Sequence, residues 1–349
     1  MLRGPIVAAD VELHPEANVV VSPLHLFRKK GLIVRPMLPE DVEDLRFVGQ
    51  EAWSDLASRD IGRKIKYPMR PRQIIEGYIQ KEPMGCLVAE KEGEIIGAAY
   101  SHVWGTVGWV GPFEVLPEHQ NVGVGGALLD ECERFLLRRG ANVIGLETMS
   151  HIPKNLHFYL SHGYAPTALT VITDKVLDAS DVDKSEDRLE VQGAREACVE
   201  DREEVSTALK RIGNSIYPGL DCSCEFDILV EKGLGTAFVW EDKGRLDGVA
   251  LLHTYQKSDD ASYSSIKLLV VDPRSERASS GFLTLLRSCE GRSHSVDKKR
   301  MCARFPVNCS DLYRTMVRLS YSIKGANIRF VKGSEYREKG VYNLTSWAG

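Results

Sequence analysis

The sequence lacks long hydrophobic runs and any strong excess of one charge. No stretch of its 349 residues approaches the roughly 18 consecutive apolar residues of a membrane-spanning helix, so we expect no membrane partner. Lysine and arginine number 45 against 49 aspartates and glutamates, a net charge of −4, which argues against a nucleic-acid partner. The apolar run near the N-terminus is too short for a secretion signal, which favours a cytoplasmic protein.

Metal-binding cysteine motifs are also missing. The chain has 8 cysteines, of which Cys222 and Cys224 form a CxC pair without a second Cys or His pair at a suitable spacing. Most cysteines sit inside apolar runs, as buried free thiols do. We therefore expect no metal and a reducing compartment, the cytoplasm.

An internal repeat accompanies a length typical of two domains. Residues 88–98 (VAEKEGEIIGA) and 239–249 (VWEDKGRLDGV) share a Val, a Glu and two Gly at the same spacing. Further pairs follow in the same order, namely 115–117 with 271–273, Gly125 with Gly281, and 163–164 with 320–321. The alternative is two unrelated domains with common hairpin chemistry.

A charged stretch without helical periodicity, residues 174–190, has the composition of a linker. We therefore place an N-terminal extension at 1–31, a first domain at 32–178, a linker at 179–187 and a second domain at 188–349.

Hydrophobic periodicity predicts an α/β fold with a mixed, mostly antiparallel sheet in each of two tandem domains, flanked by helices. In the first domain we expect strands at 32–36, 86–90, 95–104, 109–116 and 143–148 and helices from 39 and at 73–80, 126–139 and 154–162.

The sharpest motif is a glycine-rich turn between a strand and a helix, residues 115–129 (VLPEHQNVGVGGALL). Glycine lets backbone N–H groups approach a ligand, and the first N–H groups of a helix form an anion site suited to a pyrophosphate. A Walker loop would need Lys where Gly126 stands, and a dinucleotide fingerprint would need glycine where Leu128 stands. On this motif alone, a turn that serves only packing stays open.

Two segments resemble the motifs of the GCN5-related N-acetyltransferases, the GNAT superfamily. Residues 120–125 (QNVGVG) match its Gln/Arg-x-x-Gly-x-Gly/Ala signature, and residues 155–164 (NLHFYLSHGY) resemble its second motif, an Asn before an aromatic-Tyr pair and Gly-aromatic. The resemblance implies a tandem GNAT protein with acetyl-CoA as cosubstrate and direct attack by an acceptor amine in a ternary complex. It also implies the cosubstrate-binding residues Phe113, Val115, Asn121, Val122, Gly123, Val124, Gly125, Gly126 and Asn155.

For catalysis, the resemblance implies that Tyr159 protonates the leaving thiolate, since a phenol with a pKa near 10 is close to a thiol. The base stays open among Glu114, Glu147 and His102, each of which could equally be an ordinary strand residue. We assign Glu114, because strand alternation points it away from the apolar layer that contains Phe113.

The second domain departs from these motifs, which makes it a degenerate copy. The replacements are Ser279 for Gly123, Phe282 for Gly126, Glu276 for Gln120 and Met316 for Tyr159. We predict that this domain keeps the fold and has lost CoA binding.

The acceptor is expected to meet a cationic segment with two aromatic residues: Trp53, Arg63, Lys64, Lys66, Tyr67, Arg70 and Arg72. These cations suit an anionic acceptor, although a charge run is more often just a solvated face. The sequence predicts an N-acetyltransferase acting on a small-molecule amine or a peptide, and it is compatible with a homodimer. The alternative is a non-catalytic acyl-CoA sensor or scaffold.

Overall fold

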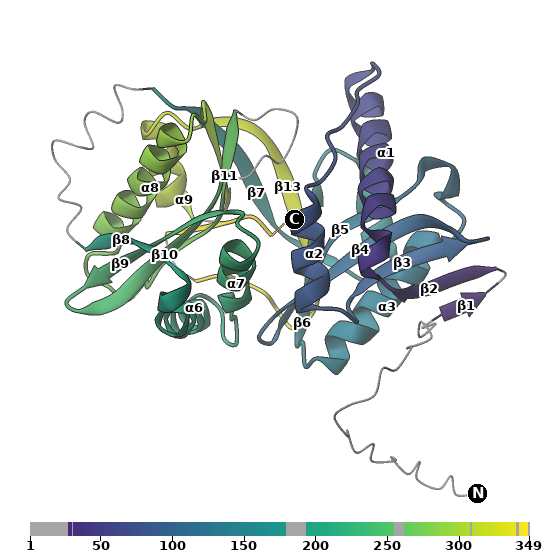
Figure 1. Cartoon of the computed structure of the whole chain (residues 1–349), viewed down its shortest axis with the longest axis horizontal. Coiled ribbons are helices and arrows are strands. Elements are labelled where there is room, and N and C mark those ends of the chain that lie inside the picture. Colours follow the sequence, from purple (N-terminus) through teal and green to yellow (C-terminus); the bar gives the residue numbers. More distant parts are fainter. Residues whose placement is uncertain are drawn as a thin grey trace, which may run out of the picture.

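The computed structural model describes residues 27–29, 31–178, 193–254, 262–307, 309–339 and 342–347 (Figure 1). Residues 1–26 of the expected extension and the whole expected linker, 179–187, lie outside the described residues. The end of the extension forms a strand, β1 (Phe27–Lys29), which pairs antiparallel with β2. No helix in the described ranges is long and apolar enough to cross a membrane.

The first half contains the helices and strands that its hydrophobic pattern predicts. After β1 come β2 (Leu32–Pro36), α1 (Val42–Ile61), α2 (Arg72–Lys81), β3 (Cys86–Lys91), β4 (Glu94–Trp104), β5 (Val107–Val115), α3 (Val124–Arg138), β6 (Val143–Met149), α4 (Pro153–Ser161) and β7 (Ala165–Val176). Most boundaries differ from the expected ones by one or two residues; in particular, α3 begins at Val124 and so includes Gly125 and Gly126 in its first turn.

The second half repeats this order. Its elements are β8 (Ala194–Ala197), α6 (Arg202–Ile216), α7 (Ser223–Glu231), β9 (Gly235–Asp242), β10 (Arg245–His253), β11 (Tyr263–Val271), α8 (Ala278–Ser295), β12 (Arg300–Pro306), α9 (Ser310–Arg318), β13 (Ser322–Gly333) and β14 (Asn343–Thr345). Short 3-10 turns at Pro39–Asp41, Pro117–His119 and Val199–Asp201 precede α1, α3 and α6.

Matching turns confirm that the two halves share one fold. The β3–β4 turn places Glu92 and Gly93 at φ 55° and 86°, and the β9–β10 turn places Lys243 and Gly244 at φ 51° and 77°. Such paired positive φ values are those of a tight hairpin turn, where glycine is favoured at the second position. The repeat in the sequence therefore corresponds to a repeat in the backbone.

A feature that the sequence did not predict is an exchange of strands between the halves. The strands form one continuous mixed sheet in the order β1-β2-β3-β4-β5-β6-β13-β7-β12-β11-β10-β9-β8. Strand β13 of the second half pairs with β6 of the first, and β7 of the first half pairs with β12 of the second. The last long strand of each half thus completes the sheet of the other (Figure 1).

Helices cover both faces of this sheet. On one face α1, α2, α6 and α7 share a single hydrophobic core that runs across both halves. The opposite face has two separate cores, one under α3 and α4 and one under α8 and α9. Helices α2 and α7 meet at Gly77, where a Cβ would lie 2.9 Å from Ile228 Cγ2. The halves are therefore joined both by strands and by a common core.

Candidate functional site

Strand β5 leaves its neighbour β6 halfway along its length. The two strands pair in parallel from Val107↔Val143 to Val110↔Leu146, and no pair in the described chain continues this ladder beyond Val110. On its other side β5 stays paired with β4 as far as Val115. One edge of the backbone from Gly111 to Val115 is thus left for another extended group, and it contains the predicted Phe113 and Val115.

The glycine turn at the end of β5 leads directly into α3. Asn121 and Gly123 have φ 63° and 93°, so both adopt the left-handed conformation, and Asn121, Val122 and Gly123 are exposed. Gly123 is the N-cap of α3 and offers no side chain to the first N–H groups of the helix. Those N–H groups, at the positive end of the helix dipole, suit a phosphate.

Glycine is favoured in this turn for two different reasons, backbone conformation and close packing. A Cβ on Gly123 would meet nothing within 4 Å, so its left-handed backbone is what favours glycine there. A Cβ on Gly125 would lie 3.3 Å from Phe158 Cζ, and one on Gly126 would lie 3.4 Å from His162 Nε2. Close packing of α4 on the start of α3 therefore accounts for part of the motif.

Gln120, the first residue of the signature, braces the turn. Its Nε2 donates to the carbonyl oxygen of Val115 over 2.9 Å. Its Oε1 accepts from Lys154 Nζ at the start of α4 over 2.6 Å. Lys154 was not among the predicted site residues, and its position in the first turn of the helix next to Asn155 was the available signal.

The predicted acid, Tyr159, lies in an aromatic cluster between the two halves. Its ring centroid is 6.5 Å from that of Phe113 on β5 and 6.0 Å from that of Phe330 on β13. Burial raises the pKa of the Tyr159 phenol, which stays protonated and able to donate. Asn155, one turn earlier on α4, donates from Nδ2 to Thr148 Oγ1 over 3.1 Å.

The predicted base, Glu114, is 2% exposed and points to the face of the sheet under α1. Its Oε1 accepts from Trp53 Nε1 over 2.8 Å and from Arg70 Nη2 over 2.7 Å, and its Oε2 accepts from Arg70 Nη1 over 3.2 Å. Burial acts against the Arg70 charge, but Glu114 more than offsets this and raises the pKa of Arg70. These bonds use three of the about four acceptor sites of an ionised carboxylate.

The two other candidates for the base have structural partners. Glu147 on β6 accepts from Arg329 Nε on β13 over 2.6 Å and from Thr170 Oγ1 over 2.9 Å. The ring of His102 donates from Nε2 to the carbonyl oxygen of Gly111 over 2.7 Å, and burial lowers its pKa to about 4. His102 therefore holds β5 at the point where it leaves β6.

The cationic segment divides into paired and exposed residues. Arg70 pairs with Glu114, and Arg72 pairs with Glu43 and Glu76. Trp53 and Tyr67 stack with ring centroids 5.5 Å apart beside the Glu114–Arg70 pair. Arg63, Lys64 and Lys66 are exposed. The structure brings Trp53, Tyr67 and Arg70 together with Glu114.

The corresponding region of the second half is filled. Phe282 in α8 is fully buried and stacks on Tyr342 with ring centroids 5.1 Å apart. At the end of β11, Asp272 accepts from Arg274 Nη2 over 2.8 Å and pairs with Arg211. Met316 is buried among hydrophobic residues. In the described ranges no group of three or more His, Cys, Asp and Glu residues could hold a metal ion.

Residues 50–164 match the model of the acetyltransferase (GNAT) family. A mycothiol acetyltransferase from Cellulomonas flavigena is 27% identical over 178 residues, which are 48% of this chain and 48% of that protein, so the match spans about half the length of this curated relative.

Solved structures share the fold across nearly the whole chain. A candidate acetyltransferase from Pyrococcus horikoshii has a TM-score of 0.67 at 18% identity and covers 92% of this chain and 97% of its own. A tandem GNAT protein from the clavulanic acid biosynthesis pathway has a TM-score of 0.55 at 14% identity, with coverages of 88% and 99%. Residues 50–164 are therefore similar to the GNAT family, and the fold of nearly the whole chain is similar to that of a tandem GNAT protein.

Proposed function

We propose that this protein is an acetyl-CoA-dependent N-acetyltransferase with one active site, in the first half. The GNAT family uses an acyl-CoA as cosubstrate and acetylates amines. The observation that carries the proposal is the open edge of β5 from Gly111 to Val115, which leads straight to the uncapped start of α3. An extended arm that ends in a diphosphate needs these two features next to each other.

The residues along this path would hold the cosubstrate in order. The backbone at Phe113 and the N–H of Val115 would bind the pantetheine arm, because a strand edge pairs with amide groups, whereas the carbonyl oxygen of Val115 already accepts from Gln120. The turn of Asn121, Val122, Gly123, Val124, Gly125 and Gly126 would hold the pyrophosphate. On α4, Tyr159 lies beside Phe113 with ring centroids 6.5 Å apart, and Asn155 is one helical turn earlier.

The side chains near Phe113 would then serve the transfer. When bound, acetyl-CoA supplies a thioester carbonyl that an amine can attack. Tyr159 would donate its phenol proton to the departing sulfur, and its burial keeps that proton in place until negative charge develops. Glu114 would accept a proton from the amine at its remaining acceptor site, while Trp53 and Arg70 hold the carboxylate in one orientation.

The acceptor would approach from the face under α1, where Glu114, Trp53 and Tyr67 lie together. The stacked rings of Trp53 and Tyr67 suit a small molecule with an apolar or planar part. The relative from Cellulomonas flavigena is named a mycothiol acetyltransferase, which favours a small-molecule amine over a protein acceptor. The second half would complete the acceptor side without a cosubstrate of its own.

The test begins with calorimetric titration of acetyl-CoA and continues with release of free CoA in the presence of amines, amino acids and peptides. We expect one acetyl-CoA per chain and release with at least one amine. Glu114→Gln should lower kcat and alter its dependence on pH while leaving the Kd of acetyl-CoA within a few-fold. Binding without release on any acceptor would favour the non-catalytic sensor, and absence of binding would refute the assignment of the site.

A further inference from the structure

The second half repeats the separation of strands that forms the groove of the first. Strands β11 and β12 pair in parallel from Tyr263↔Arg300 to Ser265↔Cys302, as β5 and β6 do from Val107↔Val143. These starting pairs are about 156 positions apart in the sequence, the spacing of the repeat. Beyond Ser265 no described pair joins β11 to β12, so a second groove opens at the equivalent place.

This second groove is occupied by the chain itself. Strand β14 pairs antiparallel with β11 at Leu268↔Thr345, Leu269↔Leu344 and Val270↔Asn343, and it also lies against β12. Bonds on either side extend the ladder, because Val271 N–H donates to the Tyr342 carbonyl oxygen and Ser346 N–H donates to that of Lys267. The positions paired with β14 correspond to Pro112, Phe113 and Glu114 in the first half.

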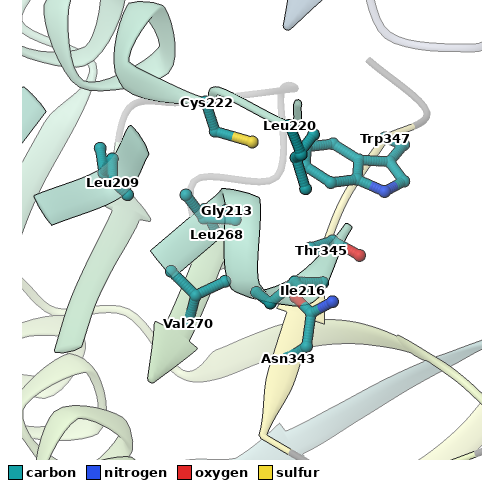
Figure 2. Close-up of a pocket in the computed structure, with 10 residues that line it drawn as sticks. All are labelled: Leu209, Gly213, Ile216, Leu220, Cys222, Leu268, Val270, Asn343, Thr345 and Trp347. Atoms are coloured by element: carbon teal, nitrogen blue, oxygen red, sulfur yellow. The ribbon is translucent and has the colours of Figure 1, made fainter. Parts of the chain in front are cut away.

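Side chains of this segment alternate between the two faces of the sheet, as in a buried strand. Leu344 is fully buried and packs in the core under α8 and α9. Asn343, Thr345 and Trp347 lie on the opposite side, lining a small cavity with Leu268 and Val270 (Figure 2). The segment is therefore recognised by its backbone and by both of its faces.

Polar and aromatic contacts fix the ends of the segment. The buried Glu338 accepts from Asn343 Nδ2 over 2.7 Å, from Trp347 Nε1 over 3.1 Å and from Arg329 Nη1 over 2.6 Å. The Trp347 ring centroid is 4.2 Å from that of Trp104 on β4 of the first half. The occupant of the second groove is thus tied to the first half as well.

We propose that the groove between β11 and β12 is a binding site for an extended peptide strand, and that residues 343–347 are its built-in ligand. Main-chain pairing at an open strand edge is the general mode by which a groove of this kind binds peptides. The start of α8 offers no cradle for a pyrophosphate, because the stacked rings of Phe282 and Tyr342 fill it. The proposal stands whether or not the first half transfers acetyl groups.

Hydrogen exchange followed by mass spectrometry tests this on the full-length chain. Leu344→Asp would place a charge in the core under α8 and should raise exchange over residues 266–271 by about tenfold or more, with β5 and β6 unchanged. Leu344→Met is the matched control and should leave exchange as in the wild type. Addition of a synthetic peptide of residues 341–349 should restore slow exchange in Leu344→Asp, and the same peptide carrying L344D should not.

A second variant covers the case in which Leu344→Asp does not fold. Ser346→Pro removes the N–H that donates to Lys267 while keeping Leu344, and it should raise exchange locally around Lys267 in the middle of β11, whereas Ser346→Ala, which keeps this N–H, should not. Fast exchange over residues 266–271 in the wild type would overturn the proposal. So would a second acetyl-CoA bound per chain in Leu344→Asp, because the groove would then be a cosubstrate site.

Discussion

The starts of helices α3 and α8 occupy the same place in the two halves and have opposite properties. At α3 a left-handed glycine cap and exposed Asn121 and Val122 leave the helix N–H groups accessible. At α8 the N-cap is Arg277, which pairs with the buried Asp242, and Phe282 takes the space of Gly126. The fold tolerates both, so it is side-chain volume and charge at a few positions that separate a ligand site from a packed core.

The largest effect is expected from a substitution at the accessible start of α3. Gly125→Glu would place a carboxylate and added volume at the start of α3, against Phe158 and where the pyrophosphate is expected. We expect acetyl-CoA binding to weaken by at least about 100-fold, since it loses both contacts and charge complementarity. Isothermal titration calorimetry measures this.

The control is Gly281→Ala, at the equivalent glycine of the second half. Its Cβ would lie 2.5 Å from the Trp240 ring, so the variant should unfold at a lower temperature while keeping the wild-type Kd for acetyl-CoA. A weakened Kd in Gly281→Ala would contradict a single site in the first half.

A smaller effect, on kcat, is expected at Tyr159. The equivalent residue of the second half is Met316, which has no proton to donate. Tyr159→Phe keeps the packing with Phe113 and Phe330 and removes only the phenol. We expect kcat to fall by roughly 100-fold, the lower range for loss of a general acid, with the Kd of acetyl-CoA unchanged. Met316→Leu, a conservative change in the second core, should leave both constants as they are. Equal kcat in Tyr159→Phe and wild type would remove Tyr159 from the mechanism.

His102, which holds β5 where it leaves β6, should make the stability of the protein depend on pH. Burial lowers the pKa of His102 to about 4, below the unfolded value of about 6.5, so the unfolded chain binds the proton more readily in this window. Stability from this group is complete above pH 6.5 and is lost as the pH falls toward 4. The loss at pH 5 is about 2 kcal/mol. Denaturant unfolding at pH 7.5 and 5 should show it in the wild type and not in His102→Gln, which keeps a donor without titrating.

The smallest effect is expected at two equivalent positions, just after α4 in the first half and just after α9 in the second. Gly163 ends α4 at φ 82°, and Ser320 follows α9 at φ 68° in the same left-handed conformation. Gly163→Ser should lower the free energy of unfolding by about 1 kcal/mol, and Ser320→Gly should raise it by roughly half as much. A loss of stability in Ser320→Gly would show that the two positions are not equivalent.

Much of the fold could be predicted because each unit uses strong local signals. Glu92-Gly93 marked a hairpin turn, and the stripe containing Leu128, Leu129 and Phe135 marked α3, and both are present. The strand exchange could not be predicted, because β7 and β13 have the same length and similar burial, and pairing partners are set by the whole fold.

Prediction of the candidate site was uneven for a related reason. The glycine turn is local, so its left-handed backbone at Gly123 follows from the sequence. The partners of Glu114 and Glu147, namely Arg70 and Arg329, are 44 and 182 positions away, and no pattern in the chain links them. The same holds for β14, whose three residues are too few to be recognised as a strand.

The exchange of β7 and β13 should keep the two halves together even when no covalent bond joins them. A single cut between residues 179 and 192 would leave each fragment holding a strand in the sheet of the other. The two pieces would then migrate apart on a denaturing gel and elute together in native size-exclusion chromatography. A gene split at that point should likewise yield a complemented pair of polypeptides, each serving as the template on which the other completes its fold.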